Sequence, residues 1–315
     1  MKEQITYSDI ITDLSHFGMI KVSGNDAKNF LQGQSTNDIR LVTTKQSQLN
    51  AFCSPKGRII VNFRVCQAGE NAYYLLLPLA SVTATLQLLQ KYVIYAAVKL
   101  EDYSDKLLRF GIAGANSPQI LADCLGCIPP TEINAISTIE QVMVLQVEGI
   151  QPRFMLFSET ESKLLQCLRE AVPPTVTATW QLLDILSGVP QIVPAIAEEF
   201  VPQMVNYHRL DGVSFTKGCY TGQEVVARMQ YLGSLKRRMY LAKIVTDSLP
   251  QAGDKLFIGS KEQNVGKIVN AQIYPEGGIV VLAVIQIEYA ETDTIHLLHQ
   301  QGKPLQLMDL PYSLS

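Results

Sequence analysis

The chain has 315 residues, of which 47% are apolar and 17% charged, and its formal net charge at pH 7 is −3. A chain of this length typically forms about two domains of ~150 residues. The charged share lies below the roughly 25% of an average globular domain, which excludes a disordered chain. The slightly acidic balance excludes a generally basic nucleic-acid binder. No apolar region follows the first lysine and no uncharged stretch is apolar enough to span a bilayer, so we expect a soluble cytoplasmic protein.

The first hundred residues alternate between strand-like and helix-like patterns. Apolar runs predict strands at 17–22, 48–53, 59–66 and 72–77. A helix is expected to begin behind Ser23, because Ser23 and Asp26 have the spacing of a capping box and apolar residues then recur at helical intervals. An amphipathic helix is predicted at 81–92 and an extended segment at 97–100. The region is therefore predicted to be a mixed unit of strands and helices.

A second mixed unit follows the first. The predicted strands are 107–113, 141–147 and 153–157, and the predicted helices are 117–125 and 159–170. Two such units in tandem are typical of an α+β architecture, in which helices cover one face of each sheet.

A proline-rich stretch separates the second unit from the C-terminal region. A helix is predicted at 178–186, carrying the only tryptophan, Trp180, and the long extended segment behind it is typical of functional loops. Short strands then recur near Leu241, Leu256, Ile268, Val281, Ile295 and Leu305. This spacing favours a small antiparallel barrel or sandwich. The predicted domains are 1–104, 105–236 and 237–315, with a boundary near Lys236.

Six cysteines are scattered along the chain, at 53, 66, 124, 127, 167 and 219. A disulfide framework is denser and occurs in shorter secreted chains, so we expect reduced thiols. Cys124 and Cys127 form a lone C-x-x-C, which could be a redox pair or half of a metal site. Because apolar residues flank the pair and no second C-x-x-C exists, we favour core packing at a helix end.

The densest motif is Lys217-Gly218-Cys219-Tyr220-Thr221-Gly222-Gln223-Glu224. Thr221 and Glu224 have capping-box spacing, so a helix is predicted from Gly222 to about Gln230. Cys219 then lies just outside a helix N-terminus, where the helix dipole and Lys217 favour the reactive thiolate. A tight turn with a small buried cysteine is the structural alternative. A Cys/His hydrolase would use His208, the histidine nearest in sequence.

Aromatic residues offer candidate surfaces for a flat ligand. Trp180 lies among leucines, which is typical of core packing, but an aromatic face can also stack against a heterocycle. Phe17 and Tyr220 are further candidates for such a platform. Neither phosphate-binding glycine pattern occurs, so a nucleotide-hydrolysing site is not expected, and the absence of H-E-x-x-H leads us to predict no metal site.

Several segments together resemble the YgfZ family of folate-binding proteins. The octapeptide at 217–224, with Val-Val-Ala-Arg behind it, is the most specific of them. Further matches lie at 30–38, 53–58, 200–203, 212–215 and 310–314. The family is similar in fold to the glycine-cleavage T-protein. The resemblance therefore implies an α+β, T-protein-like ring of two mixed α/β units and a C-terminal small antiparallel β-barrel around a folate-binding cavity, with interleaved domain boundaries.

The resemblance also implies a site for tetrahydrofolate or a derivative. The family's folate-contact aromatic residues would fall at Phe17 and Trp180, and its motif cysteine and lysine, which would carry the chemistry, at Cys219 and Lys217. Tyr220 and Gln223 are further predicted cofactor-binding residues. Position 17 departs from the family, which often has tryptophan there. Phenylalanine keeps a stacking face but lacks the indole N–H donor.

The implied function is a folate-dependent part in the synthesis or repair of iron–sulfur clusters. Its partners would be iron–sulfur enzymes, including radical enzymes that modify tRNA. The alternative is a folate-dependent aminomethyl or one-carbon transferase. Where the T-protein has a pair of aspartates, this chain has Val61 and Asn62, so we expect no such transfer.

The charge is unevenly distributed along the chain. The segment 217–243 holds six basic residues and one acid, a net charge of +5, which leaves −8 for the rest. Such a segment favours the anionic tail of a folate or an acidic partner surface. Direct RNA binding through Lys236, Arg237 and Arg238 is the alternative. Because three adjacent cations are more typical of a solvated strand edge, we do not expect it.

Overall fold

The computed structural model describes residues 8–161, 163–259 and 261–314. The described residues fall into two compact units, each built from separated stretches of chain. Unit 1 contains the residues up to 27, then 40–48 and 64–183; unit 2 contains 28–39, 49–63 and 184 onward. The domain cuts near 104 and 236 stay a prediction. None of the helices in the described ranges has the length and hydropathy needed to cross a membrane.

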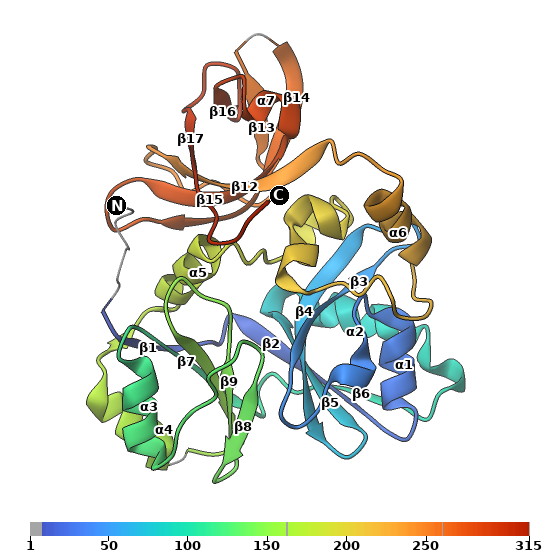
Figure 1. Cartoon of the computed structure of the whole chain (residues 1–315), viewed down its shortest axis with the longest axis vertical. Coiled ribbons are helices and arrows are strands. Elements are labelled where there is room, and N and C mark those ends of the chain that lie inside the picture. Colours follow the sequence, from blue (N-terminus) through green and yellow to red (C-terminus); the bar gives the residue numbers. More distant parts are fainter. Residues whose placement is uncertain (1–7, 162, 260, 315) are drawn as a thin grey trace. The chain divides into compact units, whose positions relative to one another are not determined.

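Unit 1 contains a sheet with the strand order β11-β1-β7-β10-β9-β8. Its strands are β1 (Ile10–Asp13), β7 (Leu108–Ala113), β8 (Ile136–Ile139), β9 (Val142–Gln146), β10 (Arg153–Ser158) and β11 (Pro174–Thr175). Neighbouring strands are antiparallel, except that β1 and β11 are parallel. Helices α3 (Ser117–Leu125) and α4 (Lys163–Ala171) lie side by side (Figure 1) and pack against one face of this sheet.

Strand β10 is buried along its whole length because both faces of its sheet are covered. Phe154 and Leu156 point to the face under α3 and α4. Met155 and Phe157 point to the opposite face and into a second core cluster. Alternating side chains of one strand therefore supply two cores.

The second sheet has the strand order β3-β4-β5-β2-β6. Its strands are β2 (Phe17–Ser23), β3 (Gln48–Cys53), β4 (Ile59–Gly69), β5 (Ala72–Pro78) and β6 (Lys99–Asp102), and the nearby helices are α1 (Ala27–Gln34) and α2 (Val82–Gln90). Strand β4 passes from unit 2 into unit 1 at Arg64. In unit 1, β4 and β2 both pair antiparallel with β5.

The main core of unit 1 lies between the two sheets and joins β2, β5 and β10 to helix α5 (Thr177–Leu186). Its largest members include Phe17, Met19, Leu76, Phe157 and Trp180. This core brings two of the three aromatic residues of the predicted folate site, Phe17 and Trp180, into one cluster.

The C-terminal part of unit 2 is a curled antiparallel sheet of strand order β16-β13-β14-β15-β12-β17 (Figure 1). Its strands are β12 (Arg237–Ile244), β13 (Lys255–Ile258), β14 (Lys261–Ile273), β15 (Ile279–Gln286), β16 (Ile295–Leu297) and β17 (Leu305–Met308), with α7 (Ile287–Ala290) between two of them. The predicted strand-rich barrel is thus confirmed as a half-barrel. The proline-rich segment before it, predicted to be extended, forms short 3₁₀ turns at Pro194–Ile196, Pro202–Val205 and Tyr207–Leu210.

Both predicted capping boxes are wrong, although the helices that they announced exist. Helix α1 begins only at Ala27, and the Asp26 carboxylate accepts a hydrogen bond from the amide of Ala97 at 2.8 Å. Helix α6 (Gln223–Tyr231) has Gly222 as its N-cap and no side-chain cap bond. In each box a side chain bonds instead to a residue that is distant in sequence.

The expectation that all cysteines are reduced is also wrong. Cys124 and Cys167 form a disulfide between α3 and α4. Their sequence separation of 43 residues explains why no local pattern indicated the pairing. The core packing predicted for Cys124 and Cys127 is correct only for Cys124, whose half-buried side chain packs against the cluster under the two helices, and wrong for Cys127, which is exposed behind the end of α3.

Candidate functional site

In unit 2, the ammonium group of Lys217 binds the last turn of α1 and the loop behind it. Its Nζ donates hydrogen bonds to the carbonyl oxygens of Gln32, Ser35 and Asn37 at 2.7, 2.7 and 2.9 Å. The side chain is only 4% exposed. Backbone carbonyls satisfy the N–H donors of an ammonium group and make its burial tolerable. Lys217 therefore ties the 217–224 motif to the 30–38 motif.

Two glycines allow the turn before α6 to pack closely against the turn before β4. Gly222 has a φ of +83°, and a Cβ there would lie 2.4 Å from the carbonyl oxygen of Ser54. Gly57 has a φ of +68°, and a Cβ there would lie 2.8 Å from the Cβ of Val225. Neither position accepts a side chain. The segments 30–38, 53–58 and 217–224 therefore form one assembly in unit 2, which we call the motif cluster.

Cys219 is a free, exposed cysteine of the motif cluster. It lies just before Gly222, the N-cap of α6, as predicted. The Nε2 of Gln223 donates a hydrogen bond to the carbonyl of Lys217 at 3.2 Å and so holds the loop that carries the cysteine. The exposed Sγ is accessible to a reaction partner.

Tyr220 lies inside the motif cluster and is 7% exposed. The Nζ of Lys217 lies 5.2 Å from the centroid of its ring, within the range of a cation–π contact. Burial raises the pKa of Tyr220, and it raises the pKa of the nearby Cys53 to about 12. Both side chains therefore stay protonated at neutral pH. Contact of Tyr220 or Gln223 with a folate stays a prediction.

His208 does not provide the base that a Cys/His hydrolase needs. Burial, and then the charges of Arg209 and Arg238, lower its pKa to about 4. Among the described residues, no hydrogen bond joins its ring to Cys219. The motif cysteine and this histidine therefore do not form a catalytic pair in the described part of the chain.

In unit 1, Phe17 and Trp180 are enclosed by protein. Phe17 opens β2, and its ring centroid lies 4.2 Å from that of His16. Trp180 is fully buried on α5, with the guanidinium of Arg153 4.1 Å from the centroid of its ring. A Cβ at Gly111 would lie 2.3 Å from the indole, so the strand backbone contacts the ring directly.

A buried charged network, which we missed in the sequence, adjoins Trp180. Arg153 donates a hydrogen bond to the backbone carbonyl of Glu148 at 3.2 Å. The Glu148 carboxylate forms an ion pair with Arg64, which also donates to Asn134. Arg64 and Arg153 are 5% and 0% exposed. Their position inside apolar strand patterns was the available signal, because an arginine is seldom fully buried without a partner.

An acceptor of this network and a donor beside it have no hydrogen-bond partner among the described residues. They are Oε1 of Glu148 and Nε1 of Trp180, both of them buried. Leaving a buried donor or acceptor unsatisfied costs about 1–3 kcal/mol. The described side chains thus leave one buried acceptor and one buried donor unused.

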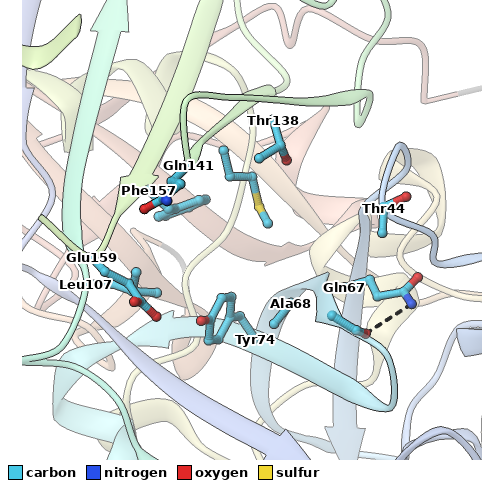
Figure 2. A pocket seen from close by; sticks show the side chains of 11 residues that line it. Thr44, Gln67, Ala68, Tyr74, Leu107, Thr138, Gln141, Phe157 and Glu159 are labelled. Atoms are coloured by element: carbon cyan, nitrogen blue, oxygen red, sulfur yellow. Dashed lines mark hydrogen bonds between the residues drawn. The ribbon is translucent and has the colours of Figure 1, made fainter. Parts of the chain in front are cut away.

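A cavity of about 320 Å³ opens beside the same core of unit 1 (Figure 2). Its lining is Thr44, Gln67, Ala68, Gly69, Tyr74, Leu107, Thr138, Gln141, Met143, Phe157 and Glu159. Figure 2 shows Phe157 and Gln141 on one side of the opening and Tyr74 and Gln67 on the other. Phe157 also belongs to the core cluster of Phe17 and Trp180, so the cavity adjoins that cluster, although neither Phe17 nor Trp180 lines it.

The charged and phenolic groups of the cavity are ready to form hydrogen bonds. The carboxylate of Glu159 accepts a hydrogen bond from the hydroxyl of Tyr103 at 3.3 Å. Burial, followed by the charges of Tyr103 and Glu159, raises the pKa of Tyr74 to about 12. Its hydroxyl therefore remains a donor at neutral pH.

Asn62 lies in unit 2, at one of the two positions where the T-protein has a pair of aspartates. Its Nδ2 donates a hydrogen bond to the carbonyl of Pro190 at 2.8 Å, and its Oδ1 accepts one from the amide of Ile192 at 2.8 Å. Both ends of the amide therefore hold the proline-rich segment. The side chain carries no carboxylate and cannot serve as a base.

Comparison with known proteins agrees with this architecture. Residues 3–151 match the GCVT N-terminal domain. The fold is similar to that of the glycine cleavage system aminomethyltransferase T from Bartonella henselae, with a TM-score of 0.77 and 16% identity over 98% of this chain and 88% of that chain. The fold and the domain match thus define a protein of the T-protein class of folds, as the sequence predicted.

Curated relatives narrow the assignment further. The tRNA-modifying protein YgfZ of Yersinia pseudotuberculosis is 31% identical over 309 residues, which are 97% of this chain and 93% of that protein. The proteins of the same name from Photorhabdus laumondii and Colwellia psychrerythraea are 31% and 28% identical, over 97% and 96% of this chain and 93% of each relative. The chain belongs to the YgfZ family.

Proposed function

We propose that this chain binds a reduced folate in unit 1 and, through Cys219 in unit 2, supports iron–sulfur enzymes that modify tRNA. The cavity beside the buried aromatic cluster carries the proposal. The printed name of the YgfZ relatives supports the tRNA part. The iron–sulfur part rests on the family resemblance of the octapeptide.

The cavity fits the ring portion of a folate in size and chemistry. Ligand cavities typically measure about 300–1,000 Å³, and this one lies near the lower end with about 320 Å³. Tyr74 and Phe157 offer aromatic faces to a flat ring. Glu159 and Gln141 offer acceptors for the amino and ring N–H groups of a pterin. The glutamate portion would extend outside.

Cations beside the cavity suit the anionic tail of a folate. Tyr103, which bonds to Glu159 of the cavity, has the Nζ of Lys21 4.9 Å and that of Lys106 5.0 Å from its ring centroid. Lys106 also lies 3.9 Å from Glu101, so part of its charge is already compensated. The ring portion of the folate would thus contact neutral and acidic groups, and the carboxylates of its tail would contact lysines.

Titration with 5-formyltetrahydrofolate, a stable reduced folate, tests the binding site. Trp180 is the only tryptophan of the chain and lies in the core that shares Phe157 with the cavity. We expect saturable quenching of its fluorescence, and about tenfold weaker binding for Glu159→Gln, because a hydrogen bond to a charged group contributes about 1.5–3 kcal/mol.

Tyr95→Ala is the matched control, because Tyr95 is 99% exposed in the same unit. It is expected to bind as the unmodified protein does. Absence of saturation, or wild-type affinity of Glu159→Gln, would contradict the proposed site.

Cys219 is proposed to carry thiol chemistry that folate binding alone does not supply. We expect Cys219→Ala to bind 5-formyltetrahydrofolate with unchanged affinity but to leave a strain lacking the protein deficient in a tRNA modification made by an iron–sulfur enzyme. Cys127→Ala, which removes the other exposed free thiol among the described residues, is the control and should restore the modification. Full rescue by Cys219→Ala would remove the role given to this cysteine.

The alternative one-carbon transfer is not favoured. Asn62 replaces a carboxylate, and both ends of its amide are hydrogen-bonded to backbone. Turnover of 5,10-methylene-tetrahydrofolate by the purified protein would revive the alternative.

A further inference from the structure

Three cysteines gather where the end of α3 meets the middle of α4 in unit 1. Cys124, in the last turn of α3, is bonded to Cys167 in α4. Cys127 is free and exposed, and it follows Cys124 by one short turn. Neither the fold nor the proposed folate site explains why a free thiol lies beside a disulfide.

The chain turns sharply at the end of α3, between Cys124 and Cys127. Gly126 adopts a left-handed conformation with φ +70°, and its amide donates to the carbonyl of Ala122 at 2.9 Å. This is the αL helix ending, in which the residue behind the glycine frequently contacts the last helical turn. Residues three apart across a turn have Cα atoms within about 7 Å, close to the span that a disulfide bridges.

We propose that Cys124, Cys127 and Cys167 form a thiol–disulfide exchange site. The thiolate of Cys127, having released its proton to water, attacks Sγ of Cys124. The bond between Cys127 and Cys124 forms as the bond between Cys124 and Cys167 breaks. Cys167 leaves as a thiolate and takes up a proton from water. One disulfide is exchanged for another, so the step needs no external oxidant or reductant.

The site also takes a small thiol of the glutathione class. Such a thiolate attacks Sγ of Cys124, forms a mixed disulfide there and releases Cys167. Cys127 then attacks the same sulfur, forms the Cys124–Cys127 bond and expels the small thiolate. Cys124 and Cys167 are half-buried rather than enclosed, and access of this kind distinguishes an exchangeable disulfide from a purely structural one.

The two buried cysteines do not enter this exchange. Cys53 and Cys66 are buried, and burial raises the pKa of each thiol to about 12. At neutral pH they stay protonated, and a thiol attacks a disulfide only as the thiolate. The exchange therefore has one nucleophile in this part of unit 1, Cys127.

Exchange changes what holds α4 in place. With the Cys124–Cys167 bond, α4 is tied covalently to α3. After exchange, packing of Leu164, Leu165 and Leu168 and the contact of Arg169 with Phe110 remain. The covalent link is then confined to the end of α3, and α4 is free to open locally.

Trapping the thiols tests the proposal on the full-length protein. The protein is incubated at pH 8 with and without glutathione, quenched in acid and alkylated, and its disulfides are mapped by mass spectrometry. We expect two species, one with the Cys124–Cys167 bond and one with the Cys124–Cys127 bond and alkylated Cys167. The second should form faster at pH 8 than at pH 6, because the thiolate fraction rises with pH.

Cys127→Ser separates exchange from a static disulfide. Without glutathione this variant should keep Cys167 unlabelled, and with glutathione it should accumulate the mixed disulfide at Cys124, which the unmodified protein resolves. Cys219→Ser, which retains all three cysteines of the site, is the control and should behave as the unmodified protein does. Finding Cys127 fully alkylated and Cys124 bonded only to Cys167 would overturn the proposal, as would finding no disulfide among the three. Neither outcome depends on folate binding.

Discussion

Replacing Gly111 by alanine is expected to lower the free energy of unfolding of unit 1 by about 3 kcal/mol, the upper part of the range for an overpacked core. The new Cβ would lie 2.3 and 2.4 Å from two carbon atoms of the Trp180 ring. The ring cannot retreat easily, because the guanidinium of Arg153 lies 4.1 Å from its centroid and the indole is fully buried. Urea unfolding followed by the emission of Trp180 measures the loss.

Gly69→Ala is the matched control for this substitution. It adds the same methyl group to a strand of the same unit, but no heavy atom lies within 4 Å of the added Cβ. Its free energy of unfolding should change by less than about 0.5 kcal/mol. Equal stability of the Gly111 and Gly69 variants would contradict the close packing of β7 against α5.

Replacing Lys217 by methionine is expected to destabilise unit 2 by about 3 kcal/mol, because hydrogen bonds to a charged group contribute about 1.5–3 kcal/mol each and part of this is offset by lysine desolvation. Methionine matches the length of the side chain but offers no donor. The carbonyls of Gln32, Ser35 and Asn37 would lose the hydrogen bonds that the Nζ donates. Hydrogen exchange at the amides of 30–38 reports the opening of this loop.

Lys236→Met separates this effect from a general loss of charge. Lys236 is exposed in the same unit and should change stability little. Lys217→Arg should recover only part of the loss, because a planar guanidinium does not reproduce the compact ammonium. A Lys217→Met protein as stable as the unmodified one, yet inactive in cells, would show that the lysine acts in the chemistry of Cys219.

Helices and strands could be predicted where the hydrophobic periodicity is visible within one segment of the chain. Helix α5 was expected at 178–186 and spans Thr177–Leu186, and the start of α6 was expected at Gly222. Strand β8 was missed because half of its residues are polar or exposed, which hides the alternation of a buried strand. The capping boxes failed because the side chains of Asp26 and Thr221 bond to residues distant in sequence.

Those residues of the candidate site that belong to a sequence motif could be predicted. The octapeptide identified Cys219 and Lys217, but the partners of Lys217 lie about 180 residues earlier in the chain. The network of Arg64, Glu148 and Arg153 joins separate strands and loops, and no spacing pattern in one segment describes it. The Cys124–Cys167 bond was hidden for the same reason.

The hydrogen bonds of Asn62 limit how this position could change by mutation. A single substitution to aspartate would restore a carboxylate but would remove the donor to the carbonyl of Pro190. It would also place a charge at a side chain that is 7% exposed, where desolvation disfavours the ionised form. An acid–base group at this position would therefore make the protein less stable, unless the proline-rich segment changed as well.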